Sequence, residues 1–211
     1  MTMRDVFIAG EDEVTKAVIE RLIKDYAPDL NILSSLPARG SQLKSKMKEF
    51  NVLSCTHPVV VLTDLDAEFC APIEKSKLLE GLTPSPDLIV NIAIDEAEAW
   101  LMADKAGFAN YFGLPLNEMP ESTLQRMSGQ KALPEMCFPI KASLHLTKYL
   151  MQKSSNVELK AQIAVSAQAK NTKGPEYNTA VVPFIWSQWN PEVARVASDS
   201  LNRMIVRLQS I

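Results

Sequence analysis

The chain has 211 residues, of which 46% are hydrophobic and 22% charged, a composition typical of a globular protein with a core of its own. Its 22 Lys and Arg residues and 25 Asp and Glu residues give a net charge of -3, which argues against a protein that coats nucleic acid through general basicity. The three cysteines follow no CxxC spacing, and no apolar run suggests a signal peptide or a membrane span. We therefore expect a reduced, cytoplasmic protein without a zinc site or a disulfide framework.

The first half of the chain alternates between apolar runs and amphipathic segments. The apolar runs predict four strands, at residues 5–9, 31–35, 59–62 and 86–94. The segments between and after them predict helices, beginning with one over residues 14–26 and ending with one over residues 95–108. This alternation over residues 4 to about 105 favours right-handed βαβ crossovers and a parallel sheet.

The second half has a different pattern. Residues 112–140 contain many prolines and no clear period, and they indicate an ordered connection with short helical turns. Residues 141–153 and the C-terminus are expected to be helical, with a polar loop over residues 171–178. The apolar positions of the C-terminal segment that we expect near one helical face are Val193, Val196, Leu201, Ile205 and Leu208. We predict an α/β core over residues 1–105 and a mainly helical extension over residues 106–211 packed on it.

Acidic residues follow three of the predicted strands. The run VVVL at residues 59–62 has no alternation, so it predicts a strand that is buried on both faces and that leads directly into Asp64 and Asp66. The other clusters are Glu11, Asp12 and Glu13 after the first strand, and Asp95, Glu96 and Glu98 after the fourth. Because the carboxyl ends of parallel strands meet at one edge of a sheet, these carboxylates are expected to converge. Convergent carboxylates bind hard cations, and we expect the cation to be Mg²⁺.

Simpler roles stand beside each part of this site. Asp64 can cap a turn, and Glu13 can complement the positive end of a helix dipole. Residues i and i+2 of an extended chain point the same way, so Asp64 and Asp66 can address one site. Glu96 and Glu98 would diverge in a regular helix, so both can face the site only if the chain is still extended there.

The arrangement of strand, Gly-x-x-Glu, helix, and then strand-Asp-x-Asp resembles the TOPRIM fold of topoisomerases, primases and the nuclease domain of overcoming-lysogenization-defect ATPases. The motifs LTDLD, EAEAWLMAD, FGLPL and GPEYN with a following Trp are similar, over nearly the whole chain, to a family of uncharacterised bacterial TOPRIM-related proteins. The resemblance implies a TOPRIM-like sheet and a phosphoryl-transfer centre that uses Mg²⁺ or Mn²⁺. It also implies nucleic acid as substrate and a neighbouring ATPase as a possible partner in phage defence.

Site residues carry over from the resemblance by position. Asp64 and Asp66 would be the metal-binding pair, and Glu13 the second acid of the first motif. The full expected sets are Glu13, Asp64, Asp66, Glu98 and Lys141 for catalysis, and Glu13, Asp64, Asp66, Glu96 and Glu98 for metal binding. One departure matters: TOPRIM enzymes carry a glutamate before the glycine, whereas this chain has Ala9 before Gly10. Either Glu11 or a glutamate of the DEAEAW segment replaces it, or cleavage has been lost.

Basic residues near the same edge suggest contacts with nucleic acid. Arg39 and Lys44 lie in and after a glycine loop, and Lys173 lies in the polar segment NTKGPEYN. The alternative for the lysines is a solvated surface position, and for Lys141 a surface helix start.

Two functions from different classes follow. The favoured one is metal-dependent cleavage of DNA or RNA. The alternative is a catalytically degenerate TOPRIM-like subunit that binds nucleic acid or a nucleotide and regulates an ATPase. A receiver-like phosphorylation module also gathers acids at strand ends, but the chain lacks the threonine and lysine arrangement of that class.

Overall fold

The computed structural model describes residues 3–38, 40–66, 70–125 and 132–211. Its centre is a four-stranded sheet in the order β2-β1-β3-β4, in which each neighbouring pair is parallel. The strands are β1 (Arg4–Gly10), β2 (Leu30–Ser35), β3 (Val59–Asp64) and β4 (Leu88–Ala93). The predicted parallel sheet is therefore confirmed, and every strand contains most of its predicted run.

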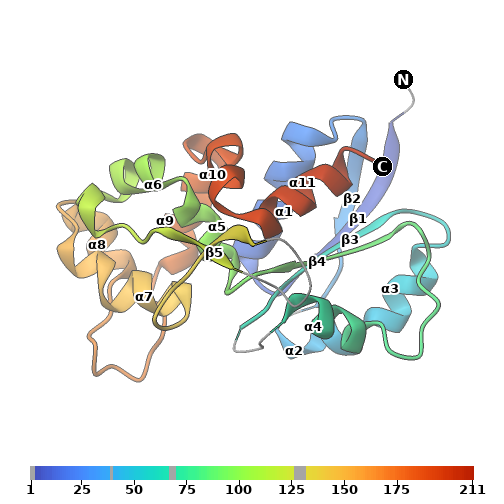
Figure 1. Ribbon diagram of the computed structural model, residues 1–211, viewed down its shortest axis with the longest axis horizontal. Coiled ribbons are helices and arrows are strands. Elements are labelled where there is room, and N and C mark those ends of the chain that lie inside the picture. The colour runs from blue at the N-terminus through green and yellow to red at the C-terminus, as the bar shows by residue number, and fades with distance from the viewer. Residues whose placement is uncertain (1–2, 39, 67–69, 126–131) are drawn as a thin grey trace.

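Helices cover both faces of this sheet (Figure 1). One face carries α1 (Glu13–Tyr26), α5 (Ala97–Ala103) and α11 (Asp199–Leu208), which share a core with Val60 and Leu62. The other face carries α2 (Ser41–Ser45), α3 (Met47–Leu53) and α4 (Ala71–Leu78), around Val59 and Val61. Since β3 is buried on both faces, it has a continuous apolar run instead of an alternating one.

The winding of the sheet reverses at β1. From β1 the chain crosses to β2 on one side, and β3 is then added on the other side of β1. In open α/β sheets, ligands bind in the crevice outside the carboxyl ends of the strands at such a switch point. Gly10 and Asp64, the last residues of β1 and β3, lie at this switch point.

The second half of the chain is mainly helical, as expected, and its elements are short. They are α6 (Lys105–Phe112), η1 (Leu116–Glu118), β5 (Ser122–Gln125), β6 (Leu133–Met136), α7 (Ala142–Lys148), η2 (Leu150–Lys153), α8 (Val157–Ile163), α9 (Tyr177–Ser187) and α10 (Pro191–Ala197). The antiparallel pair β5–β6 was not predicted. Each of its strands has only four residues, and Pro134 lies within the second, so the local pattern gives no strand signal.

Two predicted helices are each divided in the structure. The segment 95–108 forms α5 and α6, because the Asp104 carboxylate accepts a hydrogen bond from Gly107 N at 3.2 Å and caps a new helix. The prediction that the apolar residues of the C-terminal segment lie near one helical face was wrong in part. Ser198 caps α11 by accepting from Leu201 N, and this break leaves Val193 and Val196 of α10 exposed.

The two halves of the chain share one hydrophobic core. The larger buried cluster joins Ile8 of β1 and Trp100 of α5 to Phe184 of α9 and Ile205 of α11. Trp100 is fully buried within this cluster. The C-terminal half therefore packs on the sheet and completes the layer over one of its faces.

Candidate functional site at the carboxyl edge of the sheet

Glu11 lies at the switch point and is held by β3. The Thr63 hydroxyl donates a hydrogen bond to Glu11 Oε1, and the backbone N–H of Asp64 donates to the same oxygen at 3.2 Å. Gly10 permits this approach, because a Cβ on it would lie 2.7 Å from Thr15 Oγ1 and 2.9 Å from Lys16 N. The carboxylate that follows β1 is thus fixed beside the one that ends β3.

Asp64 is partly buried and is surrounded by other acids. Its Oδ1 accepts a hydrogen bond from Ala97 N, at the start of α5, at 2.9 Å. Burial raises the pKa of Asp64 well above its usual value, and the charges of Glu98, Glu11, Glu96 and Asp12 raise it further. Such a group favours a proton or a cation at neutral pH.

Lys173 neutralises the part of the cluster next to α1 and α5. Its Nζ lies 3.0 Å from Asp12 Oδ2 and 3.2 Å from Glu98 Oε1. The Tyr177 hydroxyl donates to the same Glu98 oxygen at 2.7 Å. Burial alone lowers the pKa of Lys173, but the charges of Glu98 and Asp12 outweigh it and raise the pKa above its usual value. Glu98 is buried, and burial raises its pKa although Lys173 opposes this.

Lys141 is the second cation of the cluster and lies just before α7. Its Nζ is 2.6 Å from Asp66 Oδ1 and 3.8 Å from Glu96 Oε1. The N-terminus of α7 contacts two further acids: Ala142 N donates to Asp95 Oδ1 at 3.0 Å, and Ser143 N donates to Glu96 Oε2 at 2.7 Å. The side chain of Lys141 is 45% exposed, so it remains open to a ligand.

The backbone at this edge departs from ordinary geometry at two aspartates. Asp66 has φ of 54° and Asp95 has φ of 66°, both in the left-handed region that non-glycine residues rarely adopt. The two turns are joined, since Asp66 N donates to Asp95 O at 3.0 Å. Strained residues of this kind cluster at functional sites.

This geometry corrects the expectation that Asp64 and Asp66 point the same way from an extended chain. β3 ends at Asp64, and the turn at Asp66 directs its carboxylate to Lys141. The condition placed on Glu96 and Glu98 is met, because Glu96 is extended, with φ of -145° and ψ of 166°, and α5 begins after it.

The remaining predicted residues divide into those inside the cluster and those outside it. Lys173 lies within it, not on an open nucleic-acid surface. Glu13 is 56% exposed and faces Lys16 at 3.4 Å. Lys44 pairs with Glu74 of α4 at 2.8 Å. Arg39 lies outside the described residues.

Thr63 and Tyr177 belong to the site, but neither was among the site residues predicted from the sequence. Thr63 sits inside the apolar strand run, where a hydroxyl gives no signal of its partner. Tyr177 is separated from Glu98 by 79 positions in the chain, so only the fold brings the two together.

The donor set suits one mode of metal binding. Within the described residues no three Asp, Glu, His or Cys side chains are grouped so that they could hold a metal ion by themselves. Mg²⁺ is commonly held by one or two carboxylates, with substrate phosphates and waters completing its shell. Glu11 and Asp64 fit this second mode, because each has a carboxylate oxygen that makes no hydrogen bond within the described chain.

Comparison with protein-family models, curated proteins and solved structures finds no match to this chain. Across the part of the chain described here, no helix has the length and apolar character needed to cross a membrane.

Proposed function

We propose that this protein is a metal-dependent phosphoryl-transfer enzyme, a TOPRIM-like nuclease that holds Mg²⁺ or Mn²⁺ between Glu11 and Asp64. One observation carries the proposal: the Glu11 carboxylate is fixed against Thr63 and Asp64 at the switch point of the sheet. In this reading Glu11 supplies the carboxylate that Ala9 cannot.

Electrostatics support a cation at this position. Lys173 and Lys141 pair with Asp12, Glu98, Asp66 and Glu96, whereas Glu11 and Asp64 contact no cationic side chain in the structure as described. A divalent cation would stabilise the Asp64 carboxylate, which burial and the charges of the neighbouring acids otherwise disfavour.

A bound Mg²⁺ or Mn²⁺ would neutralise charge on the phosphoryl group and activate a water. The chain's own groups serve the same chemistry. Lys141 is exposed beside Asp66 and can stabilise a transition-state phosphate. Burial raises the pKa of Asp95 to about 6, so its carboxyl group can exchange a proton near neutral pH.

A cleavage assay tests this function. The intact protein is incubated with Mn²⁺ or Mg²⁺ and with plasmid DNA, single-stranded DNA or RNA. We expect nicking that Glu11→Gln and Asp64→Asn each reduce by about 100-fold or more. Glu13→Gln is the matched control, because it removes an exposed carboxylate two positions from Glu11 and should leave cleavage unchanged.

The alternative is a binding subunit that has lost cleavage, and Ala9 before Gly10 is the observation that favours it. The assay is therefore repeated with the products of the neighbouring genes added, including any ATPase among them. If Mn²⁺ binds through Asp64 but no substrate is cut in either format, the nuclease function is wrong and the binding subunit replaces it.

A further inference from the structure

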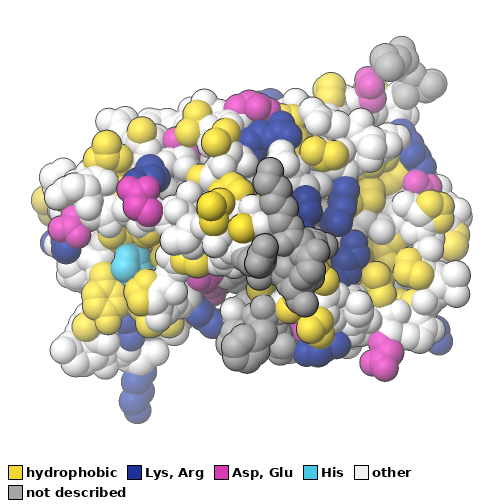
Figure 2. Space-filling view, in the orientation of Figure 1, with side chains coloured by type: hydrophobic (Ala, Val, Ile, Leu, Met, Phe, Trp, Pro, Cys, Tyr) yellow, Lys and Arg dark blue, Asp and Glu magenta, His cyan; other side chains and the backbone are white. Residues whose placement is uncertain are grey.

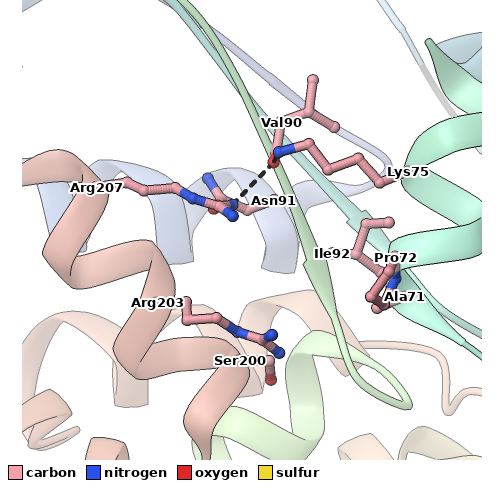
Figure 3. A pocket seen from close by; sticks show the side chains of 9 residues that line it. All are labelled: Ala71, Pro72, Lys75, Val90, Asn91, Ile92, Ser200, Arg203 and Arg207. Carbon is pink, nitrogen blue, oxygen red and sulfur yellow. Dashed lines mark hydrogen bonds between the residues drawn. The ribbon is translucent and has the colours of Figure 1, made fainter. Parts of the chain in front are cut away.

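A cavity lined by basic and apolar side chains lies at the β4 edge of the sheet. It occupies about 240 Å³ between α4, β4 and α11 (Figure 3). Its lining consists of Ala71, Pro72, Lys75, Val90, Asn91, Ile92, Ser200, Arg203 and Arg207. Lys and Arg side chains gather on this face of the molecule, over the region of β4 and α11 (Figure 2).

The cavity holds an excess of positive charge. Lys75 Nζ and Arg207 Nη1 both donate to Val90 O, at 2.9 Å and 3.1 Å, and within the described chain neither is paired with a carboxylate. Arg203 pairs with Asp199 at 3.1 Å. A second carboxylate, Glu135, bonds to the lining residue Ser200 and also interacts with Arg203, but burial raises its pKa to about 7. Among the described residues, the three cations therefore keep an excess of between one and two positive charges. Burial and the charges of Arg207 and Arg203 lower the pKa of Lys75 to about 8, as expected where cations lack an anion.

Asn91 provides an independent sign of a missing partner. The residue is 3% exposed, and its Oδ1 accepts a hydrogen bond from Arg207 Nη1 at 2.6 Å. Its Nδ2 is buried and has no hydrogen-bond partner within the described residues. An unpaired buried donor destabilises the folded protein, and a bound acceptor would remove this cost.

We propose that this cavity binds the terminal phosphate of a phosphate monoester. A monoester carries a charge of about -1.5 to -2 near neutral pH and several acceptor oxygens, which match the excess charge and the donors of Lys75, Arg203, Arg207 and Asn91. Ala71, Pro72 and Ile92 line the cavity with apolar surface for the organic part of the ligand. Addition of a peptide strand to β4 is disfavoured, because Lys75 and Arg207 already occupy Val90 O.

The phosphate has two possible sources with the same chemistry: a free mononucleotide, or the phosphorylated 5′ end of a nucleic acid strand. The cavity is lined by residues other than those of the carboxylate cluster, so this proposal does not depend on the nuclease function. Chelator in every titration removes any contribution from metal bound at Glu11 and Asp64.

Calorimetry on the full chain tests the site with inorganic phosphate, with 5′-AMP, and with a short oligonucleotide carrying either a 5′ phosphate or a 5′ hydroxyl. We expect phosphate and 5′-AMP to bind, and Arg203→Gln to weaken both about tenfold or more. Lys170→Gln removes an exposed lysine outside the cavity lining and should change neither. Binding of the phosphorylated oligonucleotide in preference to the hydroxyl form would assign the site to strand ends; no preference would assign it to the free nucleotide.

Asn91→Asp provides a second variant that should keep the bond to Arg207 while replacing the unpaired donor with an acceptor. It should abolish phosphate binding, and Asp64→Asn should leave it intact. The proposal is overturned if no phosphate compound binds the folded wild type. It is also overturned if Arg203→Gln and Asn91→Asp both bind phosphate as tightly as the wild type does.

Discussion

At the scale of single residues, Glu11 connects the two halves of the candidate site. Its carboxylate follows β1, yet its hydrogen bonds come from Thr63 and Asp64 of β3. The sequence identifies the acids after each strand, because a strand followed by carboxylates has a recognisable pattern. It does not identify which acid of the Glu11, Asp12 and Glu13 cluster faces β3, since that depends on the turn at Gly10 and on Asp12 capping α1.

Lys173 is the residue whose removal we expect to be most damaging. Lys173→Met would leave Glu98, whose side chain is only 3% exposed, without its counter-charge. Breaking a buried ion pair costs about 3–5 kcal/mol; because Lys173 is itself 33% exposed, we expect a loss of about 3 kcal/mol in the free energy of unfolding at pH 7. Urea denaturation measures this loss.

The double variant Lys173→Met, Glu98→Gln supplies the control. Neutralising Glu98 removes the unpaired charge, so the double variant should be more stable than Lys173→Met alone. If the free energy of unfolding of Lys173→Met lay within about 0.5 kcal/mol of the wild-type value, which is the error of such comparisons, the ion pair would contribute no such energy.

At the scale of elements, the periodicity of apolar residues predicted the helices and strands that are long or fully buried. It was less informative where a capping side chain determines the end of one helix and the start of the next. The four parallel strands and α1 follow directly from apolar runs and helical spacing. The breaks at Asp104 and Ser198 depend on side chains that bond to backbone N–H groups, and the β5–β6 pair depends on contacts between two short segments. These features have weak local signals.

Glu135 of β6 anchors the start of α11. Its carboxylate accepts hydrogen bonds from the Ser198 hydroxyl at 2.9 Å, from the Ser200 hydroxyl at 3.0 Å and from Ser200 N. Burial raises the pKa of Glu135 from 4.5 to about 7, more than these bonds lower it. The folded protein therefore holds this proton at a pH where the unfolded chain has released it.

This shift predicts a pH dependence of stability. A raised folded-state pKa gives stability that is fully present below pH 4.5 and is lost as the pH rises through about 7. The loss attributable to Glu135 is at most about 3 kcal/mol. We expect the free energy of unfolding to fall between pH 5 and pH 8 by less in Glu135→Gln than in the wild type. Parallel curves for the two proteins would contradict this account.

At the scale of the whole molecule, the second half completes the cover of the sheet: α11 packs on β4, and α9 packs on the outer side of α1. Ile8 and Leu62 share a core with Phe184 and Ile205, so residues 1–105 alone would expose the apolar surface of α1 and β4 that α9 and α11 cover. We expect the isolated fragment 1–105 to show no cooperative thermal transition, whereas the full chain should unfold cooperatively. A fragment that melts cooperatively would establish it as an independent domain.

The central claim is that Glu11 and Asp64 hold a divalent cation at the switch point of the sheet. The most direct measurement is a calorimetric titration of Mn²⁺ into the wild type, Asp64→Asn and Glu13→Gln. The account predicts binding to the wild type and to Glu13→Gln, and none to Asp64→Asn. Mn²⁺ binding that persists in Asp64→Asn would contradict the account. So would a folded wild type that binds no Mn²⁺ either alone or with a DNA strand present.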